Sequence, residues 1–286
     1  MYKSVLTLKA PAKINLFLEV LGKRKDGHHN LITLFLKINL FDRLYFKDNA
    51  EKEITILCTD KRVPDNSDNL VYKAAELLRK KTGCKRGAHI RIIKKIPIGA
   101  GLGGGSSDAA AALSGLNLLW KLKLTHNELL SLGRKIGADV PFFILPDSAA
   151  IGRGRGDILK PVYVKKPLWL VVVDPGIFVS TKEVYSALAL SLTKRKKDVK
   201  ILTYALKNCD IKTMANIMFN RLESVTFKKY SKLAQIKKRI SALGVRAVLM
   251  SGSGSSIFGI VDKREEAIRI KNELHGAYNV MVGRSL

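Results

Sequence analysis

Cysteine is scarce in this chain of 286 residues, which has only Cys58, Cys84 and Cys209. An odd number of cysteines without a C-x-x-C pair indicates neither a disulfide framework nor a zinc site, and it favours a reducing compartment. The N-terminal apolar run is too short for a signal peptide, and no later run reaches membrane-spanning length. The sequence therefore predicts a soluble, cytoplasmic protein.

Acidic residues are also few: the chain has 24 Asp and Glu but 51 Lys and Arg, which gives a net charge of +27. Such a charge attracts polyanions and raises the question of nucleic-acid binding. The basic clusters are scattered, however, and no recognisable nucleic-acid motif accompanies them: they lie at Arg79-Lys80-Lys81, Lys94-Lys95, Lys194 to Lys197 and Lys237-Lys238-Arg239. A solvated basic surface explains most of them, and no specific nucleic-acid partner is expected. The G-R-G-R-G run at 152–156 is interpreted as a hairpin turn.

The remaining composition is that of a globular protein, with 47% hydrophobic and 26% charged residues. The length favours two domains, with a junction near Pro161–Pro167. Alternation at Lys13–Val20 predicts a half-buried strand. The last part of the sequence predicts strands at Arg246–Met250 and Ile257–Val261, a helix at Arg264–Leu274 and a strand near Tyr278–Val282. This order of elements is typical of a split βαβ layer and favours an α+β fold. Other strands are expected at Leu31–Leu40, Arg43–Phe46, Glu53–Cys58 and Ala88–Ile96, and helices that end near Gly83 and Gly137.

The most informative segment is P-I-G-A-G-L-G-G-G-S-S-D-A-A-A-A at Pro97–Ala112, which has five glycines between Gly99 and Gly105. Glycines before a helix start let backbone N–H groups approach a phosphate closely, and a triphosphate suits such a loop best. No lysine follows the glycines, which excludes a P-loop, and the acidic residue of a dinucleotide-binding motif is missing. From composition alone, a plain turn before a helix that Ser106 or Ser107 caps is about equally plausible.

Three separated segments together resemble the motifs of the GHMP small-molecule kinases. They are P-A-K-I-N-L-F-L-E-V at Pro11–Val20, the glycine segment, and S-G-S-G-S-S at Ser251–Ser256. The run G-K-R-K-D-G-H-H-N-L-I-T-L-F after the first motif and G-A-D-V-P-F-F after the second are similar to the branch of that family that acts on a cytidine diphosphate-linked methylerythritol.

The resemblance implies transfer of the γ-phosphoryl group of ATP to the 2-hydroxyl of that substrate, with Mg²⁺, giving the 2-phosphate and ADP on the non-mevalonate route to isopentenyl diphosphate. It also implies a two-domain α+β fold with the active site in the cleft between the domains. Residues 1–160 would form an N-terminal ATP-binding domain like ribosomal protein S5 domain 2, and 161–286 a ferredoxin-like C-terminal domain.

By the same resemblance, Asp139 is the catalytic carboxylate and Lys13 is its partner. An alcohol is a weak nucleophile, so a proton acceptor and a cation near the developing charge suit this chemistry. Judged from the residues alone, Asp139 is a helix cap or turn acid and Lys13 an exposed strand residue. Whether Asp139 removes the proton or orients the hydroxyl stays open.

The resemblance assigns the other site residues as follows. The ATP-binding residues are Pro97, Ile98, Gly99, Ala100, Gly101, Leu102, Gly103, Gly104, Gly105, Ser106 and Ser107. The substrate-binding residues are Asn15, His28, His29, Thr181, Tyr185, Ser253 and Gly254. His29 would recognise the cytosine edge, whereas His28 stands where the family usually has a base-stacking tyrosine. Ser106 and Asp108 are possible Mg²⁺ ligands.

Two alternatives remain open at this point. The chain could be a GHMP kinase for another small alcohol, such as homoserine or mevalonate. It could also be a basic nucleic-acid-binding protein on a kinase fold.

Overall fold

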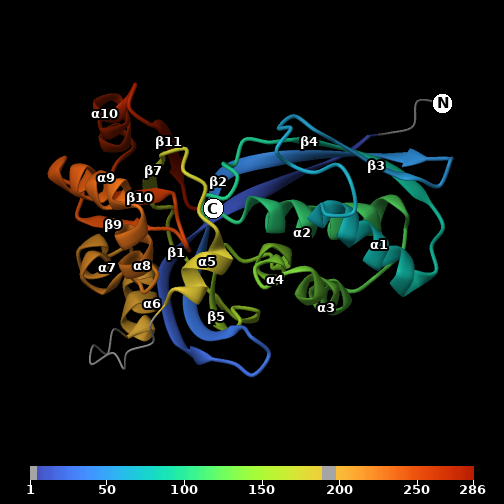
Figure 1. Ribbon diagram of the computed structural model, residues 1–286, viewed down its shortest axis with the longest axis horizontal. Helices are drawn as coiled ribbons and strands as arrows, with labels where there is room; N and C mark the ends of the chain where they lie inside the picture. Colours follow the sequence, from blue (N-terminus) through green and yellow to red (C-terminus); the bar gives the residue numbers. More distant parts are fainter. Residues whose placement is uncertain (1–4, 189–197) are drawn as a thin grey trace. The chain divides into compact units, whose positions relative to one another are not determined.

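The computed structural model describes residues 5–188 and 198–286 (Figure 1). It divides into two compact units that interleave along the chain. Unit 1 contains Met1–Ala12, Leu40–Ile96 and Gly103–Pro146, and unit 2 contains Lys13–Asn39, Pro97–Leu102 and Asp147–Leu286. The division into domains at residue 160 stays a prediction. The predicted basic cluster Lys194 to Lys197 lies outside the described residues.

Unit 1 is a sheet with helices against one of its faces (Figure 1). Its strands are β3 (Ile54–Cys58), β4 (Gly87–Ile93) and the parts of β1 (Leu6–Lys23) and β2 (His29–Asn49) that fall in this unit. Strand β4 pairs parallel to β3 and antiparallel to β2. The helices are α1 (Leu70–Thr82), α2 (Gly104–Leu119), α3 (His126–Ile136) and α4 (Val140–Ile144).

Helix α2 packs closely on the sheet because small residues face it. A Cβ on Gly115 would lie 2.7 Å from the ring of Phe46, and the alanines Ala109–Ala112 are buried. This close packing fixes the position of α2, whose first turns are the second part of the glycine segment.

Unit 2 contains two groups of strands. In the first, the remaining parts of β1 and β2 pair with β8 (Phe219–Asn220) and β5 (Ala149–Gly154), and β5 pairs with β6 (Ile158–Val162). The second is a fully antiparallel sheet in the order β11-β7-β10-β9. It consists of β7 (Trp169–Asp174), β9 (Ala247–Met250), β10 (Ile257–Val261) and β11 (Asn279–Arg284). This strand order is that of a split βαβ, ferredoxin-like layer, as predicted.

The helices of unit 2 are α5 (Thr181–Ser186), α6 (Val199–Asn208), α7 (Ile211–Ile217), α8 (Glu223–Lys229), α9 (Ser231–Ala242) and α10 (Arg264–Leu274). A buried apolar cluster that includes Val171, Ile236 and Ile270 joins α9 and α10 to the antiparallel sheet. None of the helices in the described part of the chain is long and apolar enough to cross a bilayer.

Local signals placed several elements correctly. Helix α10 has the predicted bounds, and α1 ends at Gly83 in the left-handed conformation, with φ of 70°. The G-R-G-R-G run ends β5 at Gly154 and begins the turn to β6 at Arg155, so the predicted hairpin is confirmed.

Other expectations about strand bounds, strand burial and the cap of α2 were wrong. Arg43–Phe46 is not a separate strand, because β2 runs unbroken through it. The strand over Lys13–Val20 is buried on both faces rather than half-buried. Neither Ser106 nor Ser107 caps α2: the cap position is Gly103, which makes no side-chain cap bond.

Candidate active site

Within unit 2, the first part of the glycine segment lies against the loop Ser251–Ser256. The Ser256 N–H donates to Ala100 O at 3.1 Å, and Ser251 Oγ donates to Gly101 O at 2.9 Å. A Cβ on Gly101 would lie 2.0 Å from Ser251 O, and Gly101 has φ of 75°. Because this is a backbone-to-backbone approach at positive φ, only glycine fits without rearrangement.

A row of buried polar side chains adjoins these two loops. Lys13 Nζ donates to Asn15 Oδ1 at 2.6 Å, and Asn15 Nδ2 donates to Thr33 Oγ1 at 2.8 Å. The Lys13 N–H donates to Leu102 O at 2.9 Å, and a Cβ on Gly252 would lie 3.4 Å from Asn15 Oδ1. The three predicted motifs therefore converge in one place.

Lys13 is not the exposed strand residue that its pattern alone suggested, because it is only 4% exposed. Its ammonium lies 5.3 Å from the centre of the Phe35 ring. Burying a cation is costly unless its donors are used, so a lysine in this place points to a functional role.

Three buried polar side chains that support the site were not identified from the sequence. Thr33 Oγ1 donates to Phe17 O at 2.7 Å, which completes the row from Lys13. Asn220 Nδ2 donates to Met250 O and Gly252 O, and Thr226 Oγ1 donates to Ser253 O. A polar residue inside an apolar run, as for Thr33 in L-I-T-L-F-L, is the signal that could have found the first.

The predicted substrate residues form two pairs. Thr181 Oγ1 and Ser253 Oγ are 2.9 Å apart, beside Gly254, which has φ of 93°. The rings of His29 and Tyr185 have centroids 5.1 Å apart. Burial, together with the charges of Lys23 and His28, lowers the pKa of His29. Its imidazole is therefore neutral at physiological pH and offers one donor and one acceptor.

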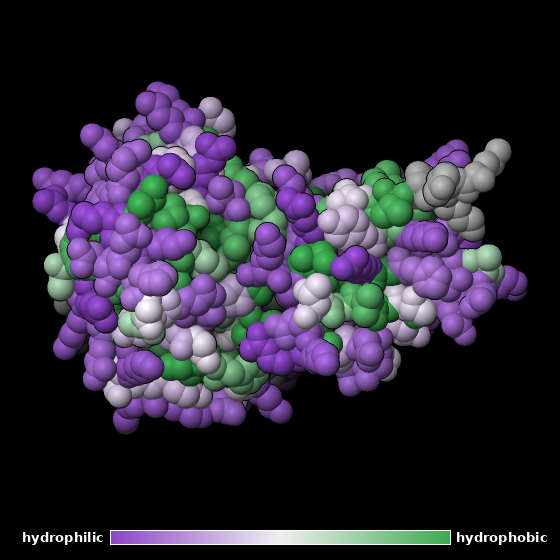
Figure 2. All heavy atoms as spheres, turned by 90° about the horizontal axis from the view of Figure 1, so that it is seen from above, coloured by the Kyte–Doolittle hydropathy of each residue, from purple (hydrophilic) through white to green (hydrophobic). Residues whose placement is uncertain are grey.

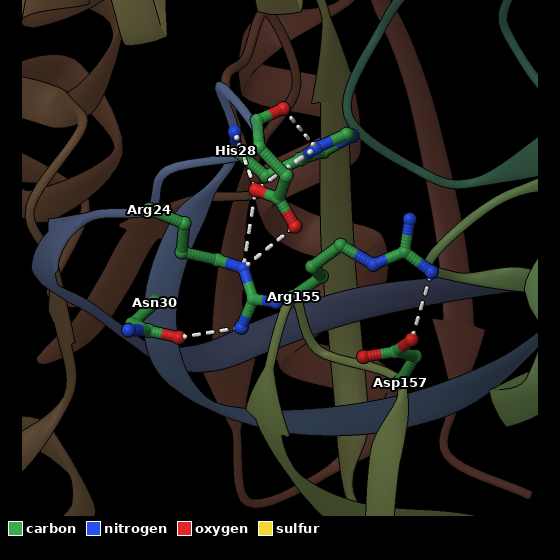
Figure 3. Close-up of polar contacts among 6 residues, drawn as sticks. Arg24, His28, Asn30, Arg155 and Asp157 are labelled. Carbon is green, nitrogen blue, oxygen red and sulfur yellow. Dashed lines mark hydrogen bonds and ion pairs between the residues drawn. The ribbon is translucent and has the colours of Figure 1, made fainter.

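His28 lies on the turn between β1 and β2, near the turn between β5 and β6 (Figure 3). Its side chain is 58% exposed, and its N–H donates to Asp26 Oδ1 at 3.1 Å. Arg24 holds the same carboxylate at 3.0 Å and also donates to Asn30. Arg155 pairs with Asp157 on the adjacent turn. The turn that carries His28 is thus held by its own hydrogen bonds.

In unit 1, the second part of the glycine segment becomes the start of α2. The first bond of the helix runs from the Ser107 N–H to Gly103 O at 2.9 Å. The N–H groups of Gly104, Gly105 and Ser106 have no acceptor within the helix, as at any helix start, and with the helix dipole they favour an anion.

A buried ion triad lies behind this helix start. Lys94 Nζ lies 2.5 Å from Asp42 Oδ2 and 2.8 Å from Asp108 Oδ2. Asp42 Oδ1 also accepts the backbone N–H groups of Lys95 and Ile96. The triad thus joins the residues just before the glycine segment to Asp108, in the helical part of that segment. Lys94 is not part of a solvated basic cluster, as its sequence neighbourhood had suggested.

Charge in the triad is close to balanced. Burial raises the pKa of Asp108 to about 7 against the opposing effect of Lys94, and Asp42 adds to the rise. Burial would lower the pKa of Lys94, but Asp108 and Asp42 raise it above its usual value. Lys94 is therefore charged, and Asp108 takes up a proton more readily than an exposed aspartate does.

Two buried oxygens of the glycine segment, Ser107 Oγ and Asp108 Oδ1, have no hydrogen-bond partner among the described residues. Unpartnered buried oxygens are uncommon, and they fit a site completed by a ligand. No cluster of three or more His, Cys, Asp or Glu that could hold a metal occurs in the described parts of the chain. A divalent ion here would need phosphate oxygens or water as additional ligands.

Asp139 belongs to unit 1 and occupies the N-cap position of α4. Its side chain is half-buried and makes no cap hydrogen bond with that helix. Of the two roles expected from spacing alone, the turn acid is confirmed, because residues 138–139 form a turn, whereas a side-chain helix cap is wrong. Its pairing with Lys13, which belongs to unit 2, stays a prediction.

Comparison with known proteins identifies the family to which this chain is similar. The GHMP kinases N terminal domain matches residues 69–146, and the GHMP kinases C terminal domain matches residues 202–280. A 4-diphosphocytidyl-2-C-methyl-D-erythritol kinase from Shouchella clausii is 42% identical over 94% of this chain and 90% of its own length. The chain belongs to the GHMP kinase family. As a GHMP kinase, it is an ATP-dependent kinase.

Further relatives of this GHMP kinase agree. A protein of the same name from Alkaliphilus metalliredigens is 44% identical over 88% of the chain and 87% of its own length. A crystal structure of 4-(cytidine 5'-diphospho)-2C-methyl-D-erythritol kinase aligns with a TM-score of 0.84 and 37% identity, covering 98% of this chain and 99% of that one. A homoserine kinase from Cytophaga hutchinsonii aligns over 100% of this chain and 96% of its own with a TM-score of 0.79, but at 21% identity it shows the fold alone.

Proposed function

We propose that this kinase transfers the γ-phosphoryl group of ATP to the 2-hydroxyl of 4-diphosphocytidyl-2-C-methyl-D-erythritol, giving the 2-phosphate and ADP in the non-mevalonate route to isopentenyl diphosphate. The observation that carries the proposal is identity of 42–44% to kinases named for this substrate over 88–95% of the chain. The neutral imidazole of His29 beside Tyr185 supports a base-bearing substrate.

The phosphates of ATP would lie along Pro97–Ser107. Backbone N–H groups at positive φ and at the start of α2 favour a multiply charged anion, and the closeness of Gly101 to Ser251 leaves no room for a side chain at that position. Ser251–Ser256 would add backbone donors near the transferred phosphate.

Mg²⁺ would neutralise charge on the phosphate oxygens. Asp108 Oδ1, with Ser106, would hold it directly or through water. The unpartnered Asp108 Oδ1 supports this assignment.

Asp139 would accept the proton of the 2-hydroxyl or hold that hydroxyl in line with the phosphate. Lys13, oriented by Asn15 at 2.6 Å, would stabilise charge that develops on the transferred group. Little further covalent chemistry is required, since phosphoryl transfer depends mainly on alignment and electrostatics.

His29 would hydrogen-bond the cytosine edge, with His28 and Tyr185 near the faces of the base. Thr181, Ser253 and Gly254 would contact the substrate diphosphate. The cytoplasm is the proposed location, on the argument from cysteine content.

A coupled assay of ADP release tests the substrate. The purified protein is given ATP, Mg²⁺ and, in separate reactions, the cytidine substrate, mevalonate or homoserine. Turnover is expected with the cytidine substrate and not above background with the other two. Turnover confined to mevalonate or homoserine would contradict the substrate assignment, and would leave the family assignment intact.

Replacement of His29 tests recognition of the base. His29→Ala should raise KM for the cytidine substrate roughly tenfold, the scale of about 1–3 kcal/mol for a lost partner of a buried polar group, with kcat less affected. Steady-state kinetics measure both parameters. The matched control is His275→Ala, at an exposed histidine after α10, which should change neither. An unchanged KM in His29→Ala would remove this residue from base recognition.

A further inference from the structure

A cavity of about 560 Å³ lies in unit 2 between α10 and the edge of the antiparallel sheet. Arg264, Lys271 and Asn272 line it from α10, and Trp169 and Arg284 line it from β7 and β11. The spacing of 264, 271 and 272 places these residues on one side of the helix, whereas Ala267, Ile270 and Leu274 are buried against the sheet.

The sheet side of the cavity is well defined. Trp169 and Arg284 are direct cross-strand partners, so their side chains leave the sheet on the same face. Asn39 Oδ1 accepts the Arg284 N–H at 2.7 Å, and a Cβ on Gly283 would lie 2.9 Å from that oxygen. Because Gly283 has no side chain, Asn39 can lie in the wall of the cavity.

All charged side chains that line the cavity are cationic. The lining contains three cationic side chains, an indole and two asparagines, and no carboxylate. Among the described residues, none of Arg264, Lys271 and Arg284 makes an ion pair, whereas elsewhere in the unit Lys237 pairs with Glu223 and Arg221 with Glu19. Three cations beside the apolar side chains of Trp169, Ile268 and Val282 fit a ligand with a multiply charged head and a smaller apolar group.

This cavity is separate from the loops of the candidate active site. Trp169 pairs with Val261 at one end of β10, and Val173 pairs with Ile257 at the other end, next to Ser251–Ser256. The two ends are four residue steps apart along the strand, roughly 13 Å at about 3.3 Å per residue. Figure 2 shows the molecule from above, the side on which α10 lies in Figure 1. On that face, small hydrophobic areas are surrounded by hydrophilic side chains.

We propose that this cavity is a second ligand site, which binds an organic diphosphate through Arg264, Lys271 and Arg284 and packs its apolar group on Trp169. Inorganic pyrophosphate would use only the cations, and an uncharged alcohol of the same carbon skeleton would use only the indole. Neither should bind as tightly as the intact diphosphate.

Calorimetric titration of the full chain with dimethylallyl diphosphate tests the proposal, with pyrophosphate and dimethylallyl alcohol as comparison ligands. The double variant Lys271→Gln/Arg284→Gln should weaken binding of the diphosphate at least tenfold, because each substitution removes a charge-assisted hydrogen bond to the diphosphate. Tryptophan emission should respond to the diphosphate in the wild type, and Trp169→Phe should remove that response.

The matched control is Lys238→Gln/Arg246→Gln, which removes the same charges at exposed positions outside the cavity. It should bind within about twofold of the wild type, as surface ion pairing is weak. Both double variants should keep the kinase activity without added diphosphate. Equal weakening in the two double variants, or wild-type binding by Lys271→Gln/Arg284→Gln, would overturn the proposal.

Discussion

Asp139→Asn should lower kcat at least about 10²-fold, the scale of general acid-base contributions, while ATP binding is retained. The substitution keeps the size of a half-buried side chain. It also disturbs no cap bond, since Asp139 makes none with α4. The loss would therefore report the missing carboxylate charge and basicity rather than a damaged fold.

Steady-state turnover and equilibrium titration with ATP measure the two quantities. Asp262→Asn, an exposed aspartate after β10, is the matched control and should retain wild-type turnover. Turnover of Asp139→Asn within a few-fold of the wild type would remove Asp139 from its role. A parallel loss of ATP binding would instead indicate a structural role.

Lys94→Met should destabilise unit 1 by about 3–5 kcal/mol, the usual result of removing one partner from a buried ion pair. Asp42 is 0% and Asp108 3% exposed, so the substitution leaves two carboxylates without their common cation. The N–H groups of Lys95 and Ile96 still donate to Asp42, and Asp108 can take up a proton, which limits the loss.

Urea unfolding followed by tryptophan emission measures this effect. In a Trp169→Phe background the signal comes from Trp120, which is buried in unit 1 and donates to Gly87 O. The control is Lys95→Met, at the exposed neighbouring lysine, which should change stability by less than about 0.5 kcal/mol. The double variant Lys94→Met/Asp108→Leu should regain part of the loss. Equal midpoints for Lys94→Met and Lys95→Met would show that the triad does not stabilise unit 1.

The elements that the sequence predicted well carry their signals locally. Helix α3 begins after Thr125, which forms a complete capping box with Glu128 in the first turn of the helix, and α1 stops where Gly83 adopts positive φ. Those preferences depend on a few adjacent residues. The burial of Lys13 and the continuity of β2 through Arg43–Phe46 depend on strands and loops that are distant in sequence.

The candidate site, too, was predictable from the sequence only in part. The three motifs indicated which segments matter, and the structure brings Lys13, Gly101 and Ser251–Ser256 together within unit 2. The ion triad could not be predicted, because Asp42 lies 52 residues from Lys94, and nothing in its own neighbourhood identifies a partner. The helix cap at Ser106 or Ser107 was wrong because Gly103 already turns the backbone with φ of 72°.

The most direct test of the account is a crystal structure of Asp139→Asn with a non-hydrolysable ATP analogue and the cytidine substrate. The account predicts the terminal phosphate against the glycine segment and Ser251–Ser256, with Lys13 near that phosphate and the 2-hydroxyl within hydrogen-bond distance of residue 139. A terminal phosphate away from both loops, or a 2-hydroxyl out of reach of residue 139, would contradict it.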